Sequence, residues 1–187
     1  MAQLVYFDSS IFIEMAAKRS KYKKQIKALL KELNEDHARI YTSILTIQEI
    51  SVAAYRPGDV ARDTHGDVKG IGVRIYEVTK DVALTCAKRE AELRYLAEQK
   101  EAKRDSSKPE TEAEKIERIC ENRRRKWDCF HIATAQEIGC SELYTADEKL
   151  LNRPKHLNLK GIRAVRPGTS LRKISGPLTE AAGLIDV

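Results

Sequence analysis

Short apolar blocks alternate along this chain with longer amphipathic stretches, and the blocks are typical of buried strands. The first block, residues 4–7, stops abruptly at Asp8 and is followed by Ser9 and Ser10. A continuous apolar run of this length is expected for a parallel strand that is covered on both faces. Four further runs, which we interpret as the remaining strands, lie at residues 37–41, 73–78, 141–144 and 162–165.

The stretches between these runs have helical periodicity. One example is the helix expected to end near residue 34, where Tyr22, Ile26, Leu29, Leu30 and Leu33 share one face. Helices are predicted at residues 11–17, 18–34, 44–55, 80–99, 112–125 and 127–138, and after residue 147, whereas residues 56–72 and 100–111 are expected to be loops. Strands that alternate with helices predict an α/β fold, a three-layer α/β/α sandwich around a mostly parallel five-stranded sheet.

The length of 187 residues is that of a single domain, which we expect at residues 1–170, with a charged insertion at about 100–126 and a tail at 171–187. The four cysteines form no Cys-x-x-Cys pair, so we expect reduced and mostly buried thiols rather than a zinc site. No apolar run approaches the roughly 20 residues that span a bilayer, and a cytoplasmic protein is expected.

The net charge of +6 and the isoelectric point near 9.1 favour an anionic partner, with nucleic acid ahead of a membrane. The run Arg123, Arg124, Arg125 and Lys126 is the candidate RNA-binding segment. The next residue, Trp127, is as well suited to core packing as to stacking on a base. A second basic group is either a solvated helix face or a flank that attracts phosphate; it comprises Lys21, Lys23, Lys24, Lys27 and Lys31.

Two aspartates follow predicted strands directly. Asp8 ends the first strand and Asp147 follows the fourth, with Thr145 between that strand and the acid. Ligands of open parallel sheets bind outside the carboxyl ends of the strands, so both acids are candidates for a functional site. The alternative is that each aspartate, or a neighbouring serine, caps the helix that follows.

Two more acids lie in apolar helices. Glu49 stands within the helix at 44–55, which is apolar on almost every side, and Asp128 stands near the predicted start of the helix at 127–138. A buried carboxylate without a partner is costly or becomes protonated, so Glu49 is expected either to reach water or to face a cation, which Asp8 can share. Asp128 can instead serve the helix dipole.

If the helices follow their strands in the usual way, Asp8, Glu49, Asp128 and Asp147 converge. Oxygen ligands of this kind suit Mg²⁺ or Mn²⁺, which can activate water and stabilise a phosphoryl transition state. His131 lies one turn from Asp128 and is interpreted as structural, because hydrolysis assisted by a metal ion needs no histidine. A haloacid-dehalogenase-like phosphatase also begins with a strand ending in aspartate, but it requires a second aspartate where this chain has Ser10.

The chain resembles the PIN-domain nucleases and, within them, the VapC-like toxin ribonucleases. The resemblance lies in four segments in order: residues 5–10 (VYFDSS), 42–50 (TSILTIQEI), 128–135 (DCFHIATA) and 143–147 (LYTAD). It implies an Mg²⁺- or Mn²⁺-dependent endoribonuclease in which Asp8, Glu49 and Asp128 bind the metal and Asp147 binds it directly or through water. Ser9, Ser10 and Thr145 would orient these groups.

The same resemblance implies RNA as substrate, an antitoxin as protein partner, and a homodimer. The segment at residues 100–126 is longer and more charged than in a minimal VapC-like chain, so a larger PIN protein with another task is an alternative to the toxin. A non-catalytic PIN-like RNA-binding or scaffold protein is the other alternative.

Overall fold

The computed structural model describes residues 2–54, 63–101, 110–152 and 161–169. The predicted loop at 56–72 and the predicted tail therefore lie partly or wholly outside the described residues. The elements are β1 (Leu4–Phe7), α1 (Ser9–Ala16), α2 (Lys23–Glu35), β2 (Arg39–Ser43), α3 (Ile44–Ala54), α4 (Thr64–Gly70), β3 (Arg74–Tyr76), α5 (Lys80–Glu101), α6 (Glu112–Ile138), β4 (Glu142–Tyr144), α7 (Glu148–Asn152) and β5 (Arg163–Val165).

The five strands form one parallel sheet in the order β3-β2-β1-β4-β5, which confirms the predicted α/β architecture. Phe7 at the end of β1 pairs with Tyr144 at the end of β4. From β1 the chain adds β2 and β3 on one side of the sheet, and it then adds β4 and β5 on the other side. The order of the strands therefore reverses between β1 and β4. This is the position at which an open parallel sheet leaves a crevice for ligands.

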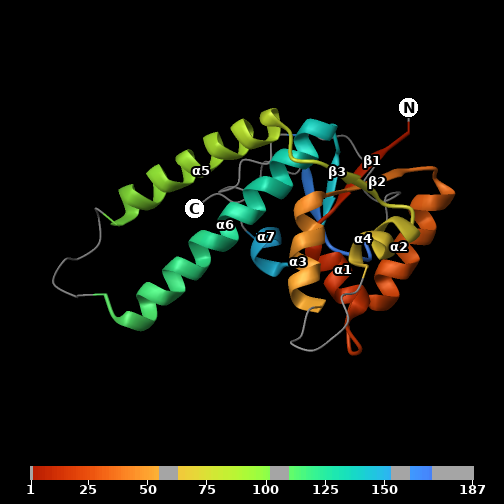
Figure 1. Cartoon of the computed structure of the whole chain (residues 1–187), viewed down its shortest axis with the longest axis horizontal. Coiled ribbons are helices and arrows are strands. Elements are labelled where there is room, and N and C mark those ends of the chain that lie inside the picture. Colours follow the sequence, from red (N-terminus) through yellow and green to blue (C-terminus); the bar gives the residue numbers. More distant parts are fainter. Residues whose placement is uncertain (1, 55–62, 102–109, 153–160, 170–187) are drawn as a thin grey trace, which may run out of the picture.

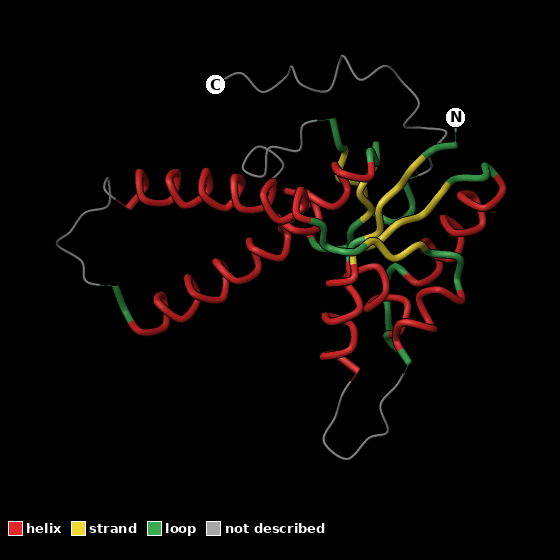
Figure 2. The backbone as a smooth tube through the Cα atoms, turned by 45° about the horizontal axis from the view of Figure 1, so that its top comes forward, coloured by secondary structure: helices red, strands yellow, loops and turns green. Residues whose placement is uncertain are grey.

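Helices cover both faces of the sheet (Figures 1 and 2). Alternate residues of β1 point to opposite faces: Val5 and Phe7 pack with α1, α2 and α4, whereas Tyr6 packs with α5, α6 and α7. The partly buried side chains of Ile47 and Ile50 place α3 on the first of these faces. The structure therefore has the three layers that the sequence predicts.

One long helix, α6, replaces the two helices predicted at 112–125 and 127–138. Its 27 residues begin at a capping box made by Thr111 and Glu114 and end at Gly139, whose φ of 80° allows the left-handed turn that stops a helix. No glycine or proline interrupts the helix, and the basic run 123–126 is not a boundary. Asp128 is thus interior to a helix, and the interpretation of it as a residue near a helix start is wrong.

The outer parts of α5 and α6 extend side by side beyond the sheet (Figures 1 and 2). Ile116, Ile119 and Cys120, which the periodicity places against the core, are exposed there, and so is Leu96. The helical spacing of these residues is as predicted, but this part of the hairpin has no sheet beneath it. Val52 of α3 is also exposed, so that helix is less buried than its composition suggests.

Two local predictions need correction. The predicted loop before β3 contains α4, whose N-cap Asp63 accepts a hydrogen bond from the Gly66 N–H at 2.8 Å. Residues Thr42 and Ser43 belong to β2, although the Ser43 hydroxyl also accepts a bond from the Leu45 N–H at the start of α3.

The prediction of reduced and mostly buried cysteines agrees with the structure. The four cysteines are free, and all but Cys120 are buried. None of the helices that the structure describes is long and apolar enough to cross a membrane.

Candidate active site

Asp8 leaves β1 at the carboxyl edge of the sheet, and its carboxylate is held by hydroxyl groups. Ser10 Oγ and Thr145 Oγ1 donate to Asp8 Oδ2 at 2.7 and 2.8 Å, and Ser9 Oγ approaches Oδ1 at 3.4 Å. Asp8 occupies the N-cap position of α1, yet its side chain makes no capping hydrogen bond. Its side chain is buried among the hydroxyl groups, so the capping interpretation is wrong for Asp8, and neither serine replaces it as the cap.

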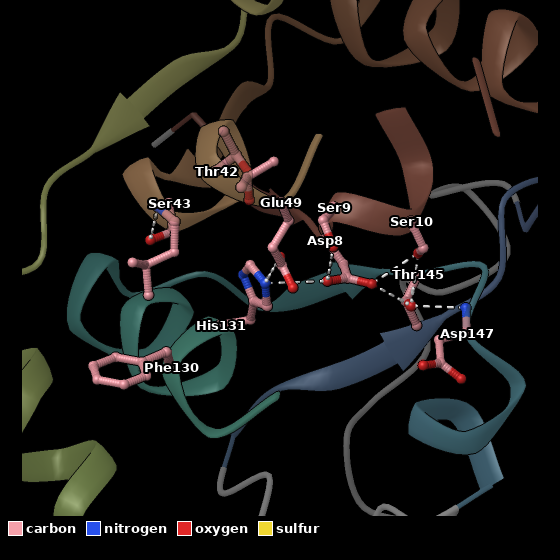
Figure 3. Close-up of polar contacts among 12 residues, drawn as sticks. Asp8, Ser9, Ser10, Thr42, Ser43, Glu49, Phe130, His131, Thr145 and Asp147 are labelled. Atoms are coloured by element: carbon pink, nitrogen blue, oxygen red, sulfur yellow. Dashed lines mark hydrogen bonds and ion pairs between the residues drawn. The ribbon is translucent and has the colours of Figure 1, made fainter. Parts of the chain in front are cut away.

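The two hydroxyl groups are themselves oriented by the backbone after β4. The Ala146 N–H donates to Ser10 Oγ at 2.9 Å, and the Asp147 N–H donates to Thr145 Oγ1 at 3.0 Å. Each hydroxyl group thus accepts from an amide and directs its proton to Asp8. This connects the exits of β1 and β4, as Figure 3 shows.

Asp147 follows its strand as Asp8 does, but its carboxylate has a different partner. Asp147 Oδ1 accepts a hydrogen bond from the Lys149 N–H at 2.7 Å, in the first turn of α7. The capping alternative is therefore realised for Asp147. Its charge still reaches the other acids, because it contributes to raising the pKa of Asp128.

Glu49 faces a cationic partner, as the burial argument anticipates. His131 Nε2 lies 2.8 Å from Glu49 Oε2 and 3.6 Å from Asp8 Oδ1, between the two acids (Figure 3). His131 Nδ1 lies 2.8 Å from the hydroxyl oxygen of Tyr6. The sequence pattern favours a structural role for His131 and gives no signal for Tyr6.

The electrostatic environment shifts the pKa values of the titratable groups in different directions. Burial alone would raise the pKa of Glu49 and lower that of His131, but their hydrogen bond and opposite charges prevail, so the pKa of Glu49 is lowered and that of His131 is raised. Burial, together with the charges of Asp8, Asp147 and Glu49, raises the pKa of Asp128 to about 7, although His131 opposes this shift. Among the acids of the site whose pKa is shifted, Asp128 is the one whose negative charge is least well balanced by positive charge nearby.

The structure therefore brings three of the predicted acids, Asp8, Glu49 and Asp128, into one electrostatic cluster, with Asp147 at its margin. In the part of the chain that the structure describes, no three His, Cys, Asp or Glu side chains are arranged to hold a metal ion. The carboxylates would have to close around a cation that binds here.

The predicted RNA-binding segment precedes Asp128 on α6. Arg123, Arg124 and Lys126 are exposed. Arg125 differs from them: it is half-buried, donates to Asn122 Oδ1 at 2.9 Å, and lines a cleft of about 510 Å³ between α5 and α6. Three of the four basic side chains are thus accessible to a ligand near the acids.

The PIN domain family model matches residues 5–156. The chain therefore belongs to the PIN domain family, whose members are nucleases. A comparison with curated proteins finds no match.

Three solved structures are similar to the chain. The DNA-bound VapBC from Salmonella typhimurium is 15% identical, with a TM-score of 0.51, and the match covers 89% of this chain and 98% of that one. VapBC2 from Rickettsia felis, bound to a promoter DNA fragment, is 13% identical over 88% and 98% of the two chains, with a TM-score of 0.49. VapC20 from Mycobacterium tuberculosis, a toxin that cleaves the sarcin–ricin loop, is 16% identical over 87% and 99%, with a TM-score of 0.48. At these identities the Salmonella structure supports the fold alone.

Proposed function

We propose that this protein is a metal-dependent endoribonuclease whose site is the acid cluster at the carboxyl ends of β1 and β4. The observation that carries the proposal is the convergence of acids from different elements at this edge: Asp8 and Glu49 lie 3.6 and 2.8 Å from the same nitrogen of His131, and their charges help to raise the pKa of Asp128. Acids held close together inside a protein need a cation before all of them can ionise. The membership of the PIN domain family supports a nuclease as the protein that uses this cation.

Asp8, Glu49, Asp128 and Asp147 would hold the cation. The donor set fits Mg²⁺ or Mn²⁺ by its chemistry, since all four donors are carboxylates, and Asp128 marks charge that a divalent ion would neutralise. When bound, such an ion lowers the pKa of water and stabilises the charge that develops on a phosphodiester.

The side chains of this protein would position the reactants around that ion. Ser10 and Thr145 hold the Asp8 carboxylate in place, and hydrogen bonding by Ser9 is one of the causes that lower the pKa of Glu49. Arg123, Arg124 and Lys126 would hold the RNA backbone through phosphate contacts that do not depend on sequence. We assign no such contact to Arg125, whose guanidinium group is engaged by Asn122.

The biological role that we propose is that of a toxin with an antitoxin partner, acting in the cytoplasm, as a homodimer. Two of the similar structures are VapBC assemblies, and the third is a toxin that cleaves the sarcin–ricin loop. These names describe those proteins; they support the choice of RNA and of a protein partner to be tested with this one.

The competing function is a PIN-like protein that binds RNA without cleaving it. The presence of all four acids favours catalysis. A phosphatase of the haloacid dehalogenase type is disfavoured, because Ser10 stands where that chemistry needs an aspartate and donates to Asp8 instead.

The test is cleavage of a mixed single-stranded RNA pool with Mn²⁺ and with a chelator. We expect cleavage with Mn²⁺ only, and its loss in Asp8→Asn. Asp81→Asn is the matched control, because Asp81 is an exposed acid in the first turn of α5. Binding without cleavage would favour the non-catalytic protein, and cleavage that survives Asp8→Asn would rule out the proposed site.

A further inference from the structure

The His131 side chain is buried, with 1% of its surface exposed, and both ring nitrogens have partners on other elements. Nδ1 lies 2.8 Å from the Tyr6 hydroxyl oxygen of β1, and Nε2 lies 2.8 Å from Glu49 Oε2 of α3. The three side chains form one hydrogen-bonded chain from the sheet, through α6, to α3. Its far end is a carboxylate of the proposed metal site.

This chain crosses between the helical layers. α3 packs with the layer that contains α1 and α2, whereas His131 belongs to α6 in the other layer and the Tyr6 side chain faces that layer from the sheet. Glu49 comes from one layer and Asp128 from the other, so a cation that binds both acids must lie between the two layers. The hydrogen bond between His131 and Glu49 joins these layers at the edge of the sheet.

A packing role alone does not account for the direction of the Glu49 side chain. The Glu49 side chain is 23% exposed, so water alone could solvate its carboxylate without a partner from the protein. It is instead turned toward His131 and Asp8 (Figure 3). Fixing a flexible glutamate in advance reduces the conformational entropy that is lost when a ligand binds.

We propose that His131, held by Tyr6, is a positioning residue that presents the Glu49 carboxylate to the divalent cation. This inference rests on the proposed function. The hydrogen bond uses Oε2 alone, so the second oxygen can bind a cation while the bond is kept. Partners of this kind behind a metal-binding carboxylate typically change metal affinity about 10- to 100-fold.

The contact with Tyr6 holds the imidazole ring in the orientation that places Nε2 toward the acids. Carboxylates accept hydrogen bonds only, so Nε2 must donate to Glu49. In the charged ring Nδ1 donates to the Tyr6 hydroxyl oxygen, and in the neutral ring Nδ1 accepts from that hydroxyl group; the 2.8 Å contact serves in both states. Removing the hydroxyl group from Tyr6 leaves the imidazole ring of His131 free to turn, while the volume of the side chain at position 6 is nearly unchanged.

The experiment measures the Kd for Mn²⁺ by electron paramagnetic resonance of the free ion, with the melting temperature of each metal-free variant recorded beside it. His131→Leu is expected to weaken Mn²⁺ binding about 10- to 100-fold. His131→Gln, whose amide can still donate at the position of Nε2, should recover most of this loss, whereas His131→Asn is too short to reach Glu49 and should not. Tyr6→Phe should shift the Kd in the same direction, by a smaller factor.

Thr134→Val is the matched control for stability. Thr134 is fully buried in the same helix and donates to the Phe130 carbonyl oxygen at 2.7 Å, away from the acids. It should lower the melting temperature without changing the Kd. An affinity that follows the melting temperature across all variants, or an unchanged Kd in His131→Leu and Tyr6→Phe, overturns the inference.

Failure of the proposed function has a different signature. It is seen in the wild-type protein, as absence of Mn²⁺ binding or of cleavage, and removes the inference with it. Wild-type binding with unchanged variants leaves the proposed function standing and removes only the role of His131. If His131→Leu does not fold, Tyr6→Phe and the comparison of His131→Gln with His131→Asn decide the matter.

Discussion

The Asp8 carboxylate depends on two hydroxyl groups that each serve two partners. Thr145 Oγ1 receives the Asp147 N–H and donates to Asp8, and Ser10 Oγ does the same with Ala146. Because Thr145 is completely buried, water has no access to take the place of its hydroxyl group. The position of Asp8 is therefore set by side chains that hold no metal themselves.

Thr145→Val keeps the shape of the side chain and removes both hydrogen bonds. We expect the free energy of unfolding to fall by about 1–3 kcal/mol, because a buried carboxylate and a buried amide each lose a partner. Denaturant titration measures this loss, with Thr134→Val as a buried comparison that has no contact with the site. A stable Thr145→Val protein with wild-type affinity for Mn²⁺ would contradict the role given to Thr145.

Asp128 makes the metal-free protein sensitive to pH. Its pKa is about 7 in the folded protein and 3.8 in its ordinary state, so the folded form binds more protons between these values and stability falls as the pH rises through them. The raised pKa of His131 acts in the same direction: its contribution is full below 6.5 and is lost as the pH rises through its folded-state pKa. The lowered pKa of Glu49 adds stability above its ordinary value of 4.5, which is lost as the pH falls through the folded-state pKa.

Thermal melting of the metal-free protein should therefore give a lower melting temperature at pH 8 than at pH 5.5. Mn²⁺ should raise the melting temperature more at pH 8, where Asp128 is ionised, than at pH 5.5, where a proton competes with the metal. Asp128→Asn should reduce both differences. Equal melting temperatures at the two pH values would contradict the assignment of excess charge to Asp128.

At the level of single residues, the sequence predicts which acids lie near one another better than it predicts what each acid touches. A strand that ends in aspartate is visible locally, but Asp8 and Asp147 share that pattern and only Asp147 caps its helix. His131 and Glu49 are 82 positions apart, so their hydrogen bond exists only in the folded chain. The signal in the sequence was a histidine inside an apolar helix, three residues after a candidate ligand.

Among the elements, α6 is the one on which the site most depends, because it carries both Asp128 and His131. A run of four basic residues looks like a boundary in the sequence, yet their side chains project from a continuous helix. Consecutive residues point in different directions around a helix, so charge repulsion within the run is small compared with the interior packing of residues 129–135, most of which are buried. The strands were easier to predict, since each is a short apolar run.

The continuity of α6 can be measured at Arg124, which is exposed. Arg124→Gly should be less stable than Arg124→Ala by about 1 kcal/mol, the cost of glycine within a helix. Denaturant titration of the two variants gives this difference. Equal stabilities would indicate a break in the helix at the basic run, as the sequence pattern suggested.

At the scale of the whole molecule, the reversal of strand order between β1 and β4 brings together residues from both ends of the chain. The exposed basic residues of α6 lie on one side of the sheet, whereas the lysines of α2 lie in the other layer. The parallel sheet and its acidic edge follow from the sequence pattern. The sequence pattern does not predict that the α5–α6 hairpin projects beyond the sheet, because an amphipathic pattern does not show what covers the apolar face of a helix.

Replacing Arg123, Arg124 and Lys126 with alanine should weaken RNA binding. It should also reduce the dependence of log Kd on log salt, by about one unit for each phosphate group that the variant no longer neutralises. The control replaces Lys24, Lys27 and Lys31 of α2, which removes the same charge from the other layer. Fluorescence anisotropy over a range of salt concentrations compares the two. An equal effect from both triple variants would show that only net charge matters.

We propose that Asp8, Glu49, Asp128 and Asp147 form one divalent-cation site. Isothermal titration calorimetry of Mn²⁺ tests it most directly, with the wild-type protein, Asp8→Asn/Asp128→Asn, and the exposed control Asp81→Asn. We predict saturable binding to the wild-type and control proteins at pH 8 and none to the double variant. Unchanged Mn²⁺ binding by the double variant would contradict the account, because the two acids would then have no part in holding the metal.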